Sequence, residues 1–163
     1  MTSTPPACTE REVLETLLDQ ARADLIGTVR GLSESAARSR LVPSATTPIA
    51  LIKHATFAER LWFQRTLGQL PDEECDGPLW PHGGFEVTDA ETVAGVVAEF
   101  EGASALARSI AARMPLDETR EHPHTGAVIS LRWISVFMTA EFARHAGHGD
   151  ILREQIDASN GMR

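Results

Sequence analysis

The chain has 163 residues, enough for one domain to bury a core without a disulfide or a structural metal. Its net charge of −8, with basic residues scattered along the chain, argues against a nucleic-acid-binding surface. There is no apolar run of about 18 residues for a membrane span, no signal-peptide pattern, and only two cysteines, so we expect a cytoplasmic protein without a disulfide framework.

The composition favours helices, because Ala, Leu, Arg and Glu are abundant and tyrosine is absent. We therefore expect an all-α fold. Residues 1–8 are predicted to form a disordered lead-in, and residues 9–160 a single domain.

Capping residues predict where the first two long helices begin. Thr9 and Glu12 have the spacing of a capping box, and the apolar stripe that follows continues until Gly31. Thr47 followed by Pro48 predicts the start of a second helix that runs to about residue 67.

Two more helices are predicted in the second half of the chain. Residues 68–87 are rich in proline, glycine and acidic residues, which indicates an irregular connection of unusual length. Thr88 and Glu91 form a second capping-box pattern, which predicts a third helix ending near Met114. After a turn-rich stretch, a fourth helix is expected to start at Ser130. The result is four long helices with long connections between them.

The fourth predicted helix carries a cluster of residues that bind metals. Glu141, His145 and His148 are three or four residues apart, so their side chains lie on one side of the helix. A catalytic zinc site needs three ligands of this kind and an open position. His54 is the candidate third ligand, because it lies on the apolar side of the second helix. From spacing alone, a metal site is no better supported than the ordinary interpretation, in which His54 is a hydrogen-bonded core histidine and Glu141 and His145 form a solvated pair.

The other histidines and both cysteines show no such pattern. His82, His122 and His124 lie beside prolines in predicted loops, which favours ordinary surface positions. Cys75 is rejected as a nucleophile, because its acidic neighbours raise the pKa of a thiol. Cys8 is rejected because it lies in the predicted lead-in without an organised partner.

Three segments resemble the DinB-like superfamily of metal-binding four-helix bundles: LVPSATTPIALIKHATFAERLWFQRTL, FEVTDAETVAGVVAEF and SLRWISVFMTAEFARHAGHGDILREQIDAS. The resemblance covers roughly residues 10–160. Within the superfamily, the combination of IKHATFAERLWF with EFARHAGHGDILRE resembles above all the actinobacterial mycothiol-dependent S-transferases, relatives of mycothiol-dependent maleylpyruvate isomerase. The implied fold is an all-α four-helix bundle of DinB-like type with long inter-helix connections.

The resemblance implies a divalent ion held between the second and fourth helices by His54, Glu141 and His145. His148 is implied as a catalytic neighbour or alternate ligand. The ion is expected to be zinc, with nickel and iron as alternatives. Mycothiol is the implied cosubstrate: the ion favours its thiolate, which attacks a small electrophile.

Further residues are assigned to the surroundings of this site. Arg144 is interpreted as a rim residue for an anionic cosubstrate, and Glu59 and Trp62 as residues at the pocket mouth. The loop with Trp80 and His82 either covers the site or is a plain surface loop.

One position departs from the pattern of the relatives, which often carry a histidine one turn before the glutamate, where this chain has Phe137. If that histidine acts on the substrate, the activity of this chain is expected to be altered or lost. Two alternatives therefore stay open: a non-catalytic metal-binding structural or regulatory bundle, and a metal-dependent hydrolase that needs no thiol. A homodimer, formed through exposed apolar residues of the first or third helix, is open as well.

Overall fold

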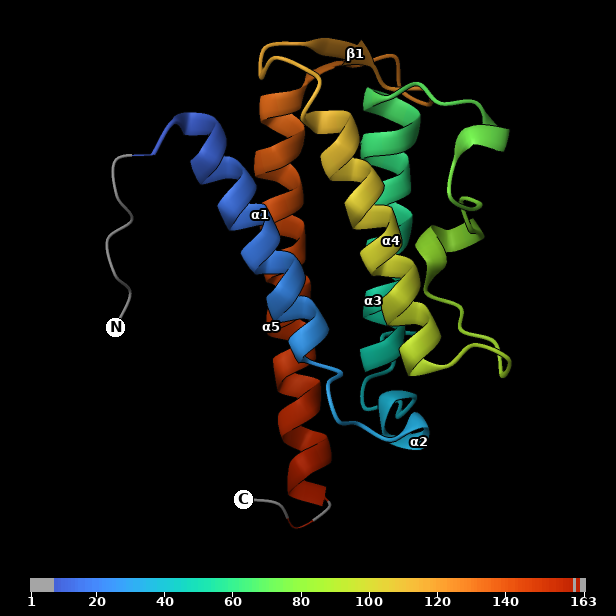
Figure 1. The fold of residues 1–163 in the computed structure, drawn as a ribbon. Coiled ribbons are helices and arrows are strands. Elements are labelled where there is room, and N and C mark those ends of the chain that lie inside the picture. Colours follow the sequence, from blue (N-terminus) through green and yellow to red (C-terminus); the bar gives the residue numbers. More distant parts are fainter. Residues whose placement is uncertain (1–7, 160, 162–163) are drawn as a thin grey trace.

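The computed structural model describes residues 8–159 and 161, and helices make up most of this part of the chain (Figure 1). In chain order the elements are α1 (Glu10–Gly27), α2 (Glu34–Ala37), α3 (Pro48–Glu59), the π-helix η1 (Arg60–Leu67), the short 3₁₀ turns η2 (Asp72–Glu74) and η3 (Pro81–Gly84), α4 (Val93–Ala111), β1 (Thr119–Glu121), β2 (Val128–Ser130) and α5 (Leu131–Ser159). The prediction of a mainly α-helical fold is confirmed. The predicted lead-in lies outside the described residues except for Cys8, which is exposed.

The first two long helices begin where their capping residues predict. At the start of α1 the Thr9 side chain accepts a hydrogen bond from the Glu12 N–H, and the Glu12 carboxylate accepts one from the Thr9 N–H (2.7 Å). Thr47 caps α3 by accepting a hydrogen bond from the Ala50 N–H, and Pro48 occupies the first turn of the helix.

The start of α4 differs from the prediction. Thr88 and Glu91 do form the predicted contact, with a 2.7 Å hydrogen bond from the Thr88 N–H to Glu91 Oε2, but the helix begins only at Val93, after its N-cap Thr92. The Glu91 carboxylate also accepts a hydrogen bond from Lys53 of α3 (2.9 Å). The motif therefore anchors the segment before α4 to α3 instead of capping α4.

Several elements are absent from the sequence-based prediction. The second long helix does continue to Leu67, but its last 8 residues form the π-helix η1, in which Thr66 Oγ1 donates to the Leu61 carbonyl five residues earlier (2.8 Å). The short helix α2 and the antiparallel β1–β2 hairpin, which pairs Arg120 with Ile129, occupy stretches expected to be irregular. π-Helical turns of this kind are frequent at functional sites.

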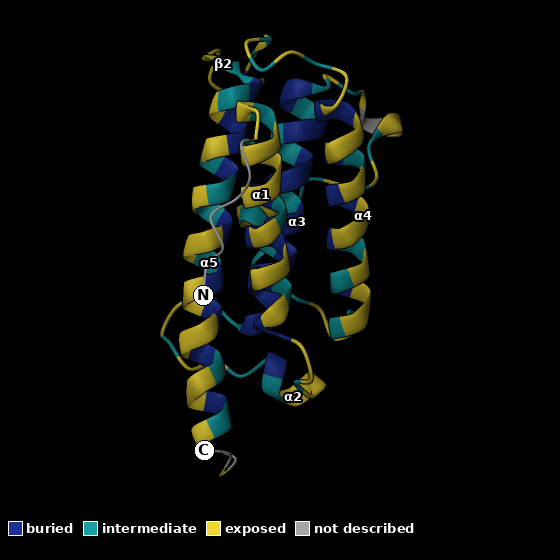
Figure 2. Cartoon of the chain, turned by 60° about the vertical axis from the view of Figure 1, so that its left-hand side comes forward, coloured by how far each residue is buried: buried dark blue, intermediate teal, exposed yellow. Residues whose placement is uncertain are grey.

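The long helices pack in two pairs, α1 with α5 and α3–η1 with α4, and α3 also contacts α5. Buried residues face the interior between these helices, and exposed residues cover the outside (Figure 2). Large apolar side chains that are fully buried fill this interior, among them Leu25, Phe63, Phe100, Ile134 and Phe142. The connection between η1 and α4 adds η3 as a further contact of α3. Helix α3 is therefore buried on almost every side.

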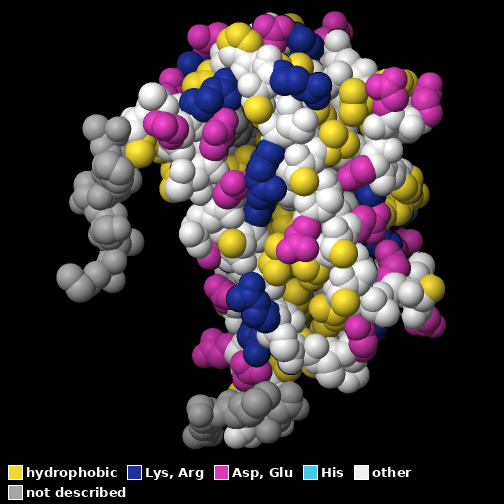
Figure 3. Space-filling view, in the orientation of Figure 1, with side chains coloured by type: hydrophobic (Ala, Val, Ile, Leu, Met, Phe, Trp, Pro, Cys, Tyr) yellow, Lys and Arg dark blue, Asp and Glu magenta, His cyan; other side chains and the backbone are white. Residues whose placement is uncertain are grey.

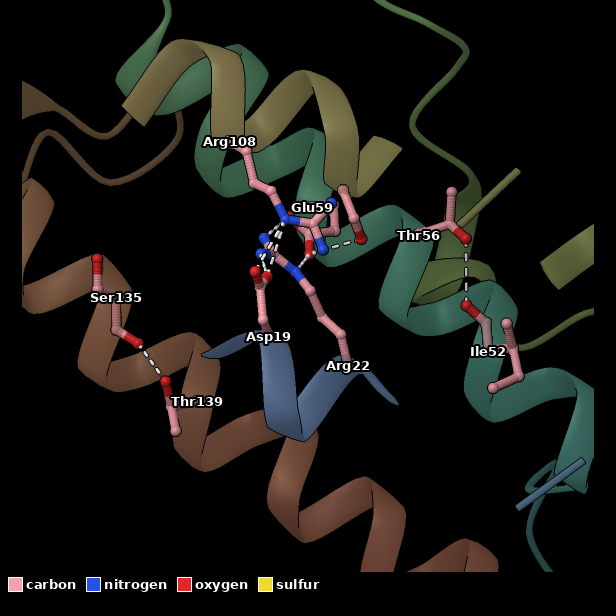
Figure 4. A network of polar contacts seen from close by, with 9 residues as sticks. Asp19, Arg22, Ile52, Thr56, Glu59, Arg108, Ser135 and Thr139 are labelled. Carbon is pink, nitrogen blue, oxygen red and sulfur yellow. Dashed lines mark hydrogen bonds and ion pairs between the residues drawn. The ribbon is translucent and has the colours of Figure 1, made fainter. Parts of the chain in front are cut away.

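A buried ion pair joins α1 to α3 within this interior (Figure 4). Arg22 donates from Nε and Nη2 to the two carboxylate oxygens of Glu59, at 2.7 and 3.0 Å. Ser104 of α4 also donates to Glu59 (3.2 Å), and Asp19 accepts a hydrogen bond from Arg22 (2.7 Å). The Glu59 side chain is fully buried. The interpretation of Glu59 as a residue at the pocket mouth is therefore wrong, because the pairing with Arg22 keeps it in the core.

None of the helices in residues 8–159 and 161 combines the length and the apolar character needed to cross a membrane. On the face of the molecule seen in Figure 3, acidic and basic side chains are mixed with apolar ones.

Candidate metal centre

The packing of α3 against α5 brings the three predicted ligands together. His54, Glu141 and His145 each offer one ligand atom, and these atoms lie within 4.8 Å of one another. The rings of His54 and His145 are 4.9 Å apart between centroids and almost perpendicular, at 85°. Glu141 and His145 lie one turn apart on α5, and Glu141 Oε2 is 3.5 Å from His145 Nε2. The site therefore combines two imidazoles and one carboxylate from two helices.

The orientation of His54 is set by the connection between η1 and α4. Its Nδ1 lies 2.7 Å from the carbonyl oxygen of Gly83. Because a carbonyl oxygen only accepts hydrogen bonds, Nδ1 carries the proton, and the lone pair of the neutral ring is on Nε2. A backbone carbonyl often fixes a metal-binding histidine in this way. The ring of Phe85 stacks on His54, with centroids 4.3 Å apart and planes at 21°.

Gly83 and Phe85 are neighbours of the candidate centre that the sequence did not predict. The one signal for them is the pair Gly83–Gly84, which indicates a left-handed turn, but nothing in the sequence says that this turn packs on His54. The segment from Trp80 to Phe85 therefore packs against His54 and is not a plain surface loop.

His145 has unsatisfied hydrogen-bonding capacity. Within the described part of the chain, neither of its buried ring nitrogens has a hydrogen-bond partner. Burial, with His54 nearby as the next cause, lowers the pKa of His145 to about 4. Burial likewise lowers the pKa of His54. Both rings are therefore neutral at pH 7, which is the form that binds a metal.

The donor set fits a divalent transition ion. Two imidazole nitrogens and a carboxylate oxygen, with a further position open, are the ligands of catalytic zinc sites. An ion bound here would also satisfy a buried nitrogen of His145 that has no other partner in the described residues.

His148 and Arg144 lie at the edge of the centre. His148 is exposed, with its ring 5.8 Å from that of His145, and it is not among the three converging ligands. Arg144 is 60% exposed and donates a 2.6 Å hydrogen bond to Glu141 Oε1. Arg144 therefore holds one carboxylate oxygen of Glu141, and its role toward an anionic cosubstrate stays a prediction.

Aromatic side chains extend from the centre along α5. Phe137, one turn before Glu141, stacks on Trp133 with centroids 4.9 Å apart and planes at 8°. Trp62 of η1 contacts both rings, at 5.0 and 5.5 Å, and His122 of the hairpin lies edge-on to Trp62 at 5.0 Å. We call Trp62, Trp133, Phe137 and His122 the aromatic cluster.

The prediction of a surface position is wrong for His122. Only 7% of this residue is exposed, because the hairpin packs it against Trp62, and its Nδ1 accepts a hydrogen bond from the His124 N–H (3.1 Å). His82 and His124 are exposed, as predicted. The pKa of the Cys75 thiol is raised, first by burial and less by Asp76, which agrees with its rejection as a nucleophile.

A family model described as mycothiol-S-transferase matches residues 13–158, which is most of the chain and includes all three converging ligands. The chain belongs to the mycothiol-S-transferase family. The resemblance seen in the sequence is thereby confirmed. No curated protein matches the chain.

Membership of the mycothiol-S-transferase family indicates a transferase activity that involves mycothiol, a low-molecular-weight thiol. A thiol that arrives as a substrate supplies its own sulfur. This accounts for a site in which neither Cys8 nor Cys75 is among the converging ligands.

Proposed function

We propose that this protein is a divalent-metal-dependent S-transferase that joins mycothiol to a small electrophile. The observation that carries the proposal is the convergence of His54, Glu141 and His145 in a member of the mycothiol-S-transferase family. Zinc is the proposed ion, since two imidazoles, a carboxylate and an open position suit it. Nickel and iron accept the same ligands.

A bound divalent ion would lower the pKa of a thiol in contact with it, so that the thiolate is available at neutral pH. The side chains of the protein supply the neutral ligands, a proton acceptor and a positive charge. His54 and His145 are neutral because burial lowers the pKa of each. His148, exposed beside His145, is proposed to accept the proton that the thiol releases or to replace a ligand. Arg144 is proposed to attract an anionic group of the cosubstrate to the rim.

The electrophile is proposed to contact the aromatic cluster. Phe137 and Trp133 precede Glu141 by one and two turns on α5, so they continue the row of side chains that forms the centre. Trp133 is 46% exposed and offers a ring face to a small apolar molecule. An electrophile stacked there would lie on the same row of α5 side chains as Glu141, with Phe137 between them.

Phe137 favours a second candidate, a non-catalytic metal-binding bundle. Its ring occupies the place where relatives often carry a histidine, and it packs against Trp62 and Trp133 instead of offering a polar atom to a substrate. In this case the ion would only stabilise the packing of α3 against α5.

The test is a conjugation assay with the metal-loaded protein, mycothiol and either a bimane or a halogenated aromatic electrophile. We expect conjugate to form faster than without protein, and His54→Ala to return the rate to the uncatalysed value. His124→Ala, which removes an exposed imidazole outside the centre, is the matched control and keeps the full rate. No acceleration with any electrophile in a protein that binds the ion supports the non-catalytic bundle. Product without thiol supports a hydrolase.

We further propose that α1, α3–η1, α4 and α5 form a four-helix bundle of DinB-like type in a single domain of residues 9–160. The pairing of α1 with α5 and of α3–η1 with α4 supports this arrangement. A homodimer is proposed through α1, where Val13 and Leu17 are 38% and 51% exposed. Sedimentation of the purified protein at several concentrations tests the dimer.

A further inference from the structure

We propose that Trp80 is a positioning residue of the metal centre: held by Lys53 and Arg60, it fixes the turn that orients His54. This inference rests on the metal site of the proposed function but does not require S-transfer. It assigns a role to the connection between η1 and α4, which contains none of the three ligands.

The turn after Trp80 has a backbone that leaves little freedom to the residues in it. His82, Gly83 and Gly84 all have positive φ, at 53°, 69° and 76°. A Cβ atom on Gly83 would lie 3.2 Å from His54 Nδ1. A Cβ atom on Gly84 would lie 3.0 Å from Trp80 Cε3 and 3.3 Å from the carbonyl oxygen of Lys53. The turn is therefore packed closely against both His54 and Trp80, and a shift of the indole would move the Gly83 carbonyl.

Two cations hold the indole of Trp80. Lys53 Nζ lies 4.8 Å from the ring centroid, and Arg60 Cζ lies 4.7 Å from it. Both distances are within the range of cation–π attraction. Lys53 is 4% exposed and Arg60 is fully buried, so water competes little with the ring for either charge. Lys53 is also the neighbour of His54 in the sequence, which links the indole directly to the backbone of the ligand.

The same cations bind the connection on both sides of Trp80. Arg60 donates to Asp76 Oδ1 (2.7 Å) and to the carbonyl oxygen of Pro78 (3.2 Å), before Trp80 in the chain. Lys53 donates to the carbonyl oxygen of Glu86 (2.6 Å) and to Glu91 (2.9 Å), after it.

Arg60 has a further partner in Glu99 of α4 (2.6 Å). The connection is therefore bound to α3–η1 at its two ends and, through Trp80, at its middle. Loss of the middle contact removes the support of the turn next to Gly84, while the ends stay bound.

The position of the Gly83 carbonyl decides which ring nitrogen of His54 carries the proton. While Gly83 accepts from Nδ1, the neutral His54 ring presents the lone pair of Nε2 to an ion. Without a fixed Gly83 carbonyl, the proton distributes over both ring nitrogens, and the His54 ring loses the hydrogen bond that sets its orientation. Loss of such a partner typically weakens metal binding about 10- to 100-fold.

The test compares Trp80→Leu with wild type in two measurements. Zinc affinity, measured by competition with a chromophoric chelator, is expected to fall about 10- to 100-fold in Trp80→Leu. In the metal-free protein, the nitrogen-15 chemical shifts of His54 are expected to change from those of a single Nδ1–H tautomer to those of a mixture. Trp80→Phe keeps an aromatic face for both cations and is expected to lie between the two.

Trp133→Leu is the matched control, because it makes the same substitution in the aromatic cluster, where the Trp133 ring contacts Trp62 and Phe137. It is expected to leave the zinc affinity and the His54 shifts unchanged. The proposal is overturned if Trp80→Leu keeps both the wild-type zinc affinity and the single His54 tautomer. It is also overturned if Trp133→Leu loses as much zinc affinity as Trp80→Leu. If wild type binds no divalent ion, the proposed function fails, and the His54 shifts alone decide the role of Trp80.

Discussion

His54 shows how the chemistry of one residue depends on groups that are distant in the sequence. Its place on the apolar side of a helix follows from the spacing of residues 51–62, and so does its candidacy as a ligand. Which of its nitrogens is available follows from the Gly83 carbonyl, 29 residues further on. Hydrogen-bond partners of this kind are set by tertiary packing, so no local pattern predicts them.

The lowered pKa values of the two histidines predict how the stability of the metal-free protein depends on pH. The pKa of His145 is about 4, and burial lowers that of His54, against 6.5 for both in the unfolded chain. Between about pH 4 and 6.5 the unfolded chain therefore binds more protons, and stability rises with pH. We expect a lower free energy of unfolding at pH 5 than at pH 7 in denaturant titrations. His145→Gln should reduce this difference, and an undiminished difference contradicts the assignment.

The buried ion pair predicts a large effect of removing one charge. Arg22→Leu leaves the Glu59 carboxylate in the core without its cation, and we expect a loss of about 3–5 kcal/mol in the free energy of unfolding. Arg108→Leu is the control, because Arg108 and its partner Asp19 are both about half exposed, and it should cost less than about 1 kcal/mol. Urea denaturation measures both, and equal losses would show that Glu59 is not confined to the core.

At the scale of elements, helix starts are easier to predict than the paths between helices. The starts of α1 and α3 depend on side chains within one turn of the first residue, which the sequence displays. The box at Thr88 and Glu91 shows the limit of this reasoning: the local contact forms, but Lys53 of another helix also binds Glu91, and α4 begins later.

Two glycines of α5 predict opposite effects of the same substitution. A Cβ atom on Gly147 would meet nothing within 4 Å, so Gly147→Ala should stabilise the protein by up to about 1 kcal/mol through helix propensity. A Cβ atom on Gly149 would lie 2.7 Å from Thr28 Cγ2, so Gly149→Ala should cost about 1–3 kcal/mol by forcing α5 away from the end of α1. Thermal and urea unfolding measure both, and stabilisation by both variants would disprove the close approach.

For the whole molecule, metal binding should act as a link between α3 and α5. An ion that binds only the folded state at 1,000 times its Kd stabilises it by about 4 kcal/mol. At this concentration we expect zinc to raise the free energy of unfolding by about 4 kcal/mol relative to the chelator-treated protein. The gain should vanish in His145→Ala and persist in His124→Ala. Equal gains in both variants would place the zinc elsewhere.

The mainly helical fold, the starts of α1 and α3 and the spacing of the candidate ligands could be predicted from the sequence, because these features depend on neighbours within a few turns of the chain. It also carried the resemblance to the family. The burial of Glu59 in the core, the packing of His122 on Trp62 and the contact of the Trp80 segment with His54 could not be predicted from the sequence. Burial and hydrogen-bond partners arise where distant segments meet, and that meeting depends on how the helices pack against one another.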